Sequence, residues 1–137
     1  MADSATEELS SEDVQGRAQE AFSEGLRMLE VEHPAEAVTA FTRALEAYRT
    51  LPGTHHQQAD CLHNLAQSLR EVGQFDQALD SYRQALGLYR QVDGTESQQA
   101  RCLTNTGVVL DDMGRHEEAL AFYQQAQEIY PQPDGGR

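Results

Sequence analysis

The sequence contains no lysine and no tryptophan, so its basic side chains, histidine aside, are all arginine. The chain therefore lacks side-chain amines for acylation or ubiquitin attachment. Against 10 arginines stand 23 acidic residues, which gives a formal net charge of -13 at pH 7. Because an acidic surface repels nucleic acid backbones and anionic membranes, we expect neither as a partner. The charge favours a partner with basic character, or it serves solubility alone.

Long hydrophobic runs are also missing. No stretch approaches the roughly 18 apolar residues that a membrane-spanning helix needs. The opening segment MADSATEELSSED has neither the basic nor the apolar region of a secretory signal. We therefore expect a cytoplasmic protein in which the thiols of Cys61 and Cys102 stay reduced.

Residues that favour strands are sparse, because Val, Ile and Thr are outnumbered by the helix-favouring Gln, Glu, Ala, Leu and Arg. Proline and glycine are few and clustered, which leaves room for long helices between the clusters. The composition predicts an all-α fold, and the length of 137 residues is that of one domain.

Three segments of the chain align at a constant offset of 41 residues, starting at Ala21, Leu62 and Leu103. Large apolar residues recur within each segment at i, i+3, i+4 and i+7, the spacing of an amphipathic helix. Small residues recur beside them, where they let two helices approach closely. These small positions are Gly25, Ala66 and Gly107, then Ala37, Ala78 and Ala119, then Ala44, Ala85 and Ala126. Each segment therefore predicts a pair of packed helices.

Turn signals divide the segments into six expected helices. Gly73 and Gly114 stand where the C-terminus of a helix often needs a left-handed residue, and Ser10 with Asp13, or Ser11 alone, is placed to cap the first helix. Thr54 and Thr95 are placed to cap the helices that follow them. The expected helices lie at about 11–31, 35–51, 55–72, 75–92, 96–113 and 116–130.

The same signals predict the organisation of the chain. We expect an acidic, disordered N-terminus at 1–10, a repeat domain at 11–131 and a flexible tail at 132–137. Within the domain, the repeats are expected at about 18–58, 59–99 and 100–133.

The small and aromatic positions of these segments resemble the tetratricopeptide repeat. The small positions carry the resemblance together with Phe41, Tyr82 and Tyr123, and Pro131 stands at the final proline position of the repeat. The resemblance implies a right-handed αα-superhelix of three helix pairs. The period is longer than the usual repeat of about 34 residues, and in this it is similar to the stretched repeats of kinesin light chain and of certain polarity adaptors.

The resemblance implies an adaptor or scaffold whose first helices line a concave groove that receives a peptide segment of a partner protein. The candidate peptide-binding residues at the groove positions are Phe22, Leu26, His63, Asn64, Gln67, Arg70, Arg101 and Asn105. Asn64 and Asn105 share one position, and their amides could clamp a peptide backbone. Alternatively, they are solvated residues of an exposed helix face.

Charges within the expected groove suggest what the peptide would carry. Arg70 and Arg101 could pair with an acidic residue between them. Asp111 and Asp112 make the far end acidic, which suits a basic segment.

Other functions have weaker sequence support. Some relatives hold a C-terminal carboxylate with five basic and amide residues, of which only Asn64 and Arg101 are matched here. No nucleophile motif, phosphate-binding loop or zinc-protease motif occurs. The one conceivable metal cluster lacks a second pair at ligand spacing and consists of His55, His56, Cys61 and His63. We expect no enzyme, no cofactor and no metal site.

Self-assembly is the alternative function. The terminal repeats of a solenoid normally need polar caps, and relatives with three repeats usually end in an additional solvating helix. The sequence up to Arg137 has no room for one after the third segment. Phe122 lies off the main apolar stripe of the last helix, so we expect an adhesive C-terminal end that could form a homodimer.

Overall fold

The computed structural model describes residues 9–129, which form six helices and, within that range, no strand. The helices are α1 (Ser11–Glu30), α2 (Pro34–Arg49), α3 (His55–Glu71), α4 (Phe75–Tyr89), α5 (Glu96–Asp112) and α6 (His116–Ile129). Each begins and ends within two residues of the bounds expected from the sequence, apart from α4, whose last turn is shorter. The expected flexible tail at 132–137 and most of the expected disordered N-terminus lie outside the described residues.

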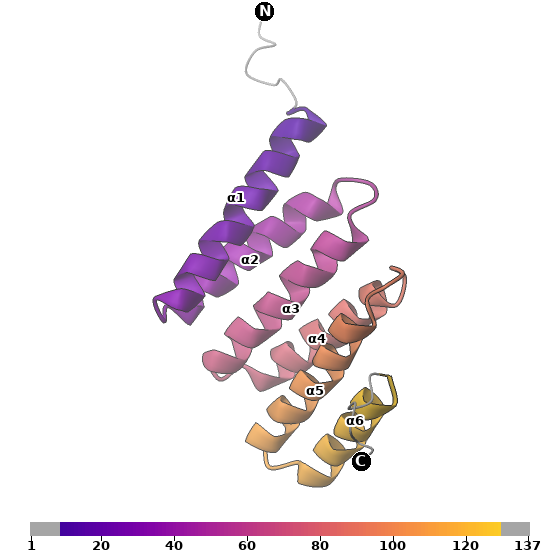
Figure 1. The fold of residues 1–137 in the computed structure, drawn as a ribbon. Helices are drawn as coiled ribbons and strands as arrows, with labels where there is room; N and C mark the ends of the chain where they lie inside the picture. Colours follow the sequence, from indigo (N-terminus) through magenta and orange to yellow (C-terminus); the bar gives the residue numbers. More distant parts are fainter. Residues whose placement is uncertain (1–8, 130–137) are drawn as a thin grey trace, which may run out of the picture.

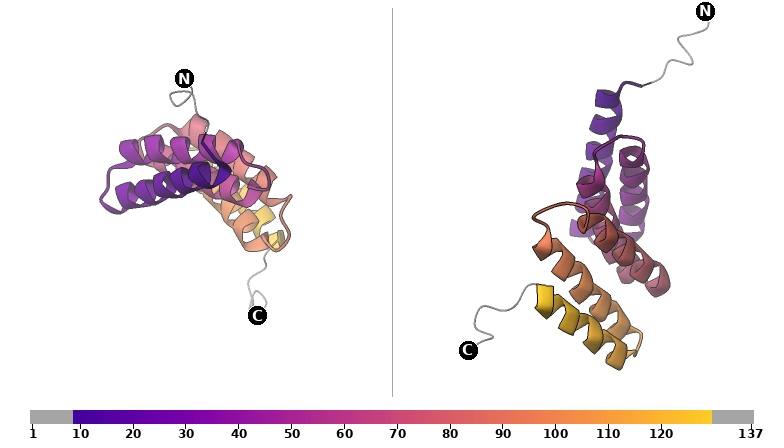
Figure 2. Two further views of the ribbon diagram at one scale, coloured as in Figure 1. Left: turned by 90° about the horizontal axis from the view of Figure 1, so that it is seen from above. Right: turned by 90° about the vertical axis from the view of Figure 1, so that its right-hand side faces the viewer.

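Each helix packs antiparallel against the next one along the chain, and the three pairs stack one after another (Figure 1). We call α1, α3 and α5 the first helices of their pairs and α2, α4 and α6 the second helices. Two further views show that the stack follows a curved path from the α1–α2 pair to the α5–α6 pair (Figure 2). The expectation of an all-α helical solenoid is confirmed.

The core is made of alanines and a few large side chains between successive helices. Phe41, Leu62, Leu103 and Val109 are the largest apolar side chains that are fully buried. A Cβ atom on Gly25 would lie 2.6 Å from the ring of Phe41, which no real structure tolerates without a shift. The small residues thus act as expected, because they let the aromatic rings of the second helices lie against the first helices.

The turns inside the pairs use left-handed residues. Gly73 and Gly114 have φ angles of 83° and 80°, as expected from the sequence. Glu32 occupies the same place in the first pair with φ of 62°, the one non-glycine residue with positive φ among the described residues. An L-residue with a side chain is strained in this conformation.

The two threonines between the pairs do not cap the helices that follow them, so this expectation is wrong. The hydroxyl of Thr54 donates instead to the backbone oxygens of Tyr48 and Leu51, at 2.7 and 3.0 Å. Thr95 makes the equivalent contacts with Tyr89 and Val92 at 2.6 and 2.8 Å. Each hydroxyl thus adds a donor to carbonyls at the end of the preceding helix, where Tyr48 and Tyr89 also accept backbone N–H groups from Leu51 and Val92. By contrast, Ser10 caps α1 as expected, since its hydroxyl accepts from the backbone N–H of Asp13 at 3.1 Å.

Candidate peptide-binding surface

The side chains of the first helices that point away from the second helices form one surface, which we call the first-helix surface. Its members are Phe22, Leu26, Asn64, Gln67, Arg70, Arg101, Thr104 and Asn105, all exposed or half-buried. Seven of them are candidates from the sequence. The eighth candidate, His63, lies beneath this surface.

The α1 part of the first-helix surface is apolar. Leu26 is 44% exposed, one of four large apolar side chains that are exposed among residues 9–129. Phe22 is half-buried and meets the ring of Phe41 edge to face, with centroids 5.5 Å apart. Phe22 therefore contributes in part to the core, and Leu26 is the apolar side chain that this part offers to solvent.

The α3 part contains an amide and a buried imidazole side by side. The Nδ2 atom of Asn64 donates to the backbone oxygen of Asp60 at 2.9 Å. His63, the residue before Asn64, is only 7% exposed. Its ring lies edge to face with the ring of Tyr82, and the two centroids are 5.3 Å apart. Desolvation by burial and, to a lesser extent, the nearby charge of Arg101 lower the pKa of His63, and Asp60 opposes them in part, so that the pKa falls to about 4. The imidazole is therefore neutral at pH 7.

His63 joins α3 to α5 through both of its ring nitrogens. Nδ1 lies 3.7 Å from Sγ of Cys102, and Nε2 lies 3.3 Å from Nδ2 of Asn105. Asn105 is half-buried, and it stands in α5 at the place that Asn64 has in α3. Two amide side chains of consecutive repeats thus lie at the first-helix surface, and the nitrogen of each has a partner within the protein.

The charged end of this surface is internally paired. Arg70 of α3 forms an ion pair with Asp112 of α5, and Asp111 accepts a hydrogen bond of 2.8 Å from the hydroxyl of Tyr123. His116 lies 2.9 Å from the other carboxylate oxygen of Asp111. Asp112 is thus paired within the protein, whereas the hydrogen bonds to His116 and Tyr123 lower the pKa of Asp111 and keep its carboxylate ionised. Arg70 is likewise engaged, whereas Arg101 is exposed.

The pairing of Cys102 with His63 resembles a thiol–imidazole dyad only in composition. Cys102 is fully buried, and desolvation raises the pKa of its thiol to about 12. A thiol with such a pKa stays protonated at pH 7 and is a poor nucleophile. Cys61, in the same place one repeat earlier, is equally buried, and the pKa of its thiol is also raised to about 12. In the described part of the chain, no three His, Cys, Asp or Glu side chains are placed to hold a metal ion.

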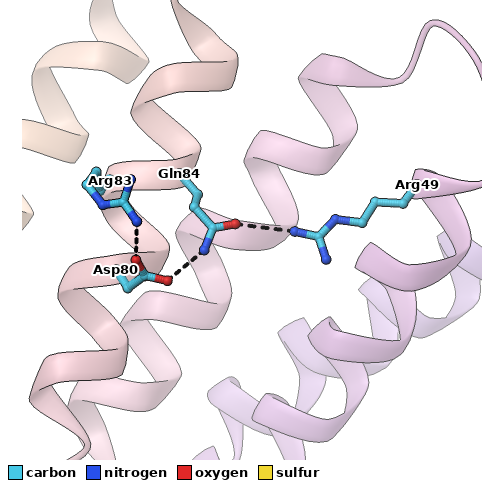
Figure 3. Close-up of polar contacts among 4 residues, drawn as sticks. All are labelled: Arg49, Asp80, Arg83 and Gln84. Atoms are coloured by element: carbon cyan, nitrogen blue, oxygen red, sulfur yellow. Dashed lines mark hydrogen bonds and ion pairs between the residues drawn. The ribbon is translucent and has the colours of Figure 1, made fainter.

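The second helices carry a polar network and a cavity. Asp80 of α4 binds Arg83 and accepts a hydrogen bond of 2.7 Å from Gln84, whose other end accepts one of 3.3 Å from Arg49 of α2 (Figure 3). Beside this network, a cavity of about 670 Å³ opens between α4, α5 and α6. Its apolar lining is Leu79, Leu86, Leu103, Leu110, Ala121 and Phe122.

Phe122 occupies this cavity wall instead of the end of the solenoid. It is half-buried and packs beside Leu86 of α4, so it is not the exposed apolar side chain that the sequence suggested. The same place holds the small residues Ala40 in α2 and Ser81 in α4. Phenylalanine at this place therefore distinguishes the third repeat from the first two.

Comparisons with known proteins bear on this arrangement. The family model of the tetratricopeptide repeat matches residues 28–91 and 82–132. This chain belongs to the tetratricopeptide repeat family. No curated protein sequence matches it. Members of the family bind protein partners, which supports a role in protein–protein interaction.

Several solved structures are similar to it in fold. The tetratricopeptide repeat domain of Arabidopsis FLU has a TM-score of 0.74 at 19% identity, over 84% of this chain and 95% of that one. A similar protein from Chlorobium tepidum has a TM-score of 0.74 at 24% identity, over 88% and 83% of the two chains. Aspartyl phosphate phosphatase F from Bacillus subtilis has a TM-score of 0.77 at 15% identity.

These similarities concern the fold alone. The chain covers only 30% of the length of the Bacillus phosphatase, although 83% of the chain is matched. None of the helices among residues 9–129 is long and apolar enough to cross a bilayer.

Proposed function

We propose that the protein is an interaction scaffold that binds a peptide segment of a partner on its first-helix surface. The observation that carries the proposal is the pair of amides, Asn64 and Asn105, at the same place in consecutive repeats. Each has its Nδ2 atom engaged within the protein, Asn64 by the backbone oxygen of Asp60 in its own helix and Asn105 by the His63 ring of α3. Each amide oxygen is then left for a partner, and a peptide backbone offers N–H donors regardless of its sequence.

The neighbours of the two amides suit a short ligand of mixed character. Leu26 offers exposed apolar area at the α1 end, where burial against an apolar anchor would contribute about 25 cal/mol per Å². Arg101 offers an exposed cation on α5, one turn before Asn105. The ligand that fits best is a peptide with one apolar anchor and an acidic or polar residue beyond it.

A displayed library of random short peptides tests this proposal, because it samples many apolar and acidic combinations at once. Wild type is used for selection, and the enriched peptides are measured against the double variant Asn64→Ala/Asn105→Ala. The matched control is Gln77→Ala/Gln125→Ala, which removes two exposed amides from the second helices instead. All three chains are first compared by circular dichroism.

We expect peptides whose affinity falls at least tenfold in the asparagine variant and stays unchanged in the glutamine control. Loss of two hydrogen bonds of about 1 kcal/mol each gives this magnitude. The proposal fails if no peptide is enriched, or if enriched peptides bind the asparagine variant as well as wild type.

Self-assembly remains the second candidate function because of Leu120. This residue of α6 is 55% exposed, whereas Val38 and Leu79, at the same place in α2 and α4, pack against a core cluster. In this second candidate function, two C-terminal ends meet and each covers the Leu120 of the other.

A further inference from the structure

The imidazole of His63 lies beneath the first-helix surface, in contact with Asn105. Its side chain comes from α3, yet both ring nitrogens face residues of α5. Tyr82 of α4 covers one edge of the ring. Each of these neighbours limits the rotation of the ring, so the positions of Nδ1 and Nε2 are set by packing.

The atoms in contact determine where the ring proton lies. The Nδ2 atom of Asn105 can donate a hydrogen bond but cannot accept one. Nε2 of His63, 3.3 Å away, is therefore the acceptor. In a neutral imidazole the proton then resides on Nδ1. Nδ1–H points at Sγ of Cys102, 3.7 Å away, and sulfur is a weak acceptor.

We propose that His63 is a positioning residue that holds the Asn105 side chain with its Oδ1 atom toward the first-helix surface. There Oδ1 accepts a hydrogen bond from a backbone N–H of the bound peptide. This inference rests on the proposed function. Asn64 has the same orientation by another route, because its Nδ2 donates to the backbone oxygen of Asp60. The second and third repeats thus each present an amide oxygen, as a hydrogen-bond acceptor, toward the first-helix surface.

The orientation has a consequence for specificity. Two outward oxygens require two N–H donors from the peptide, and proline has none. Peptides selected on the wild-type chain should therefore avoid proline at two positions. N-methylation of either peptide nitrogen that donates to these oxygens should weaken binding about tenfold, because it removes a hydrogen bond and adds a clash. N-methylation elsewhere in the peptide should leave the affinity unchanged.

Other charged groups near the ring leave this protonation state in place. From α5, Arg101 disfavours the imidazolium, and from α3, Asp60 favours it less strongly than burial opposes it. Cys102 and Tyr82 face the ring with pKa values raised to about 12, so both are neutral at pH 7. Nε2 therefore remains an acceptor under ordinary conditions.

The first test needs no ligand. In the isotope-labelled full chain at pH 7, the ¹⁵N chemical shifts of His63 report the tautomer. We expect the Nδ1–H form, with a scalar coupling between Nε2 of His63 and Nδ2 of Asn105 across the hydrogen bond. The Nε2–H form would overturn the proposal, because Asn105 would then turn its oxygen inward. This outcome is independent of whether any peptide binds.

The second test uses a peptide selected as described above. His63→Leu removes the acceptor and should weaken binding about tenfold, whereas His63→Gln keeps a side-chain oxygen near Asn105 and should stay within about threefold of wild type. Adding Asn105→Ala to His63→Leu should cost nothing further. A merely structural role would weaken both His63 variants equally and make the two losses additive. If His63→Leu does not fold, the tautomer measurement on wild type still decides.

Discussion

Glu32, in the turn between α1 and α2, has the same left-handed conformation as Gly73 in the turn between α3 and α4, with φ angles of 62° and 83°. The third pair uses Gly114 at this place. Only in the first pair does the turn force a side chain into a region that costs an L-residue about 1–2 kcal/mol. The repeat therefore retains the turn geometry even where the residue that favours it is missing.

Replacing Glu32 by glycine should stabilise the protein by about 1 kcal/mol, since the relief of strain exceeds the added entropy of the unfolded chain. The same replacement at Glu46, which is exposed in the last turn of α2, should destabilise it by up to about 1 kcal/mol. Urea unfolding of both variants measures the two effects. Two changes of the same sign would mean that the strain at Glu32 has been relieved by other means.

The close approach of α5 and α6 gives a second prediction. A Cβ atom on Gly107 would lie 2.5 Å from the ring of Tyr123, so Gly107→Ala should cost about 1–3 kcal/mol. Gly87 lies in α4 with no atom within 4 Å of an added Cβ. Gly87→Ala should stabilise by up to about 1 kcal/mol. Thermal unfolding of the two variants distinguishes them, and a neutral Gly107→Ala would show that Tyr123 can move aside.

The sequence predicted best those features that recur in every repeat. The signals for helix bounds, left-handed turns and small contact positions each appear at least twice in the chain, so a pattern that arises by chance is seldom mistaken for them. Gly73 and Gly114, for example, stand at the same place in two repeats and both predict a left-handed turn there. The helix-forming composition and the apolar spacing pointed to the same fold.

Features that depend on one repeat, or on contacts between repeats, were not predictable. His63 shares its place with Phe22 and Thr104, and no local pattern distinguishes a buried histidine from a surface one. The ion pair of Arg70 with Asp112 joins residues far apart in sequence, so it appears only when α3 and α5 are placed together.

The buried imidazole makes stability depend on pH. The pKa of His63 is lowered from 6.5 to about 4, so between these values the unfolded chain binds a proton that the folded chain does not. Stability is therefore unaffected above about pH 7 and falls as pH drops through this window, by about 3 kcal/mol near pH 4.

His63→Gln should lack this dependence. The carboxylates titrate alike in both proteins, so the difference between wild type and variant isolates the histidine. Urea unfolding at intervals from pH 7 to pH 4 measures it. Parallel stability curves for the two proteins would contradict the burial of a neutral His63.

The self-assembly alternative predicts a dimer that depends on Leu120. Its exposed side chain should be covered when two C-terminal ends meet, so Leu120→Arg should convert the dimer to a monomer. Val31→Arg is the matched control, because Val31 is equally exposed at 55% but lies directly after α1, far from the C-terminal end. Light scattering across a range of concentrations gives the mass. A wild-type chain that stays monomeric throughout would leave Leu120 without this role.

The most direct test of peptide binding is to map where a selected peptide lies on the chain. Titration of the ¹⁵N-labelled protein with that peptide reports on every backbone amide and on the side-chain amides of Asn64 and Asn105. We predict the largest shifts along α1, α3 and α5, with both asparagine side chains among them. Shifts confined to α4 and α6, around the cavity lined by Phe122, would contradict the assignment of binding to the first-helix surface.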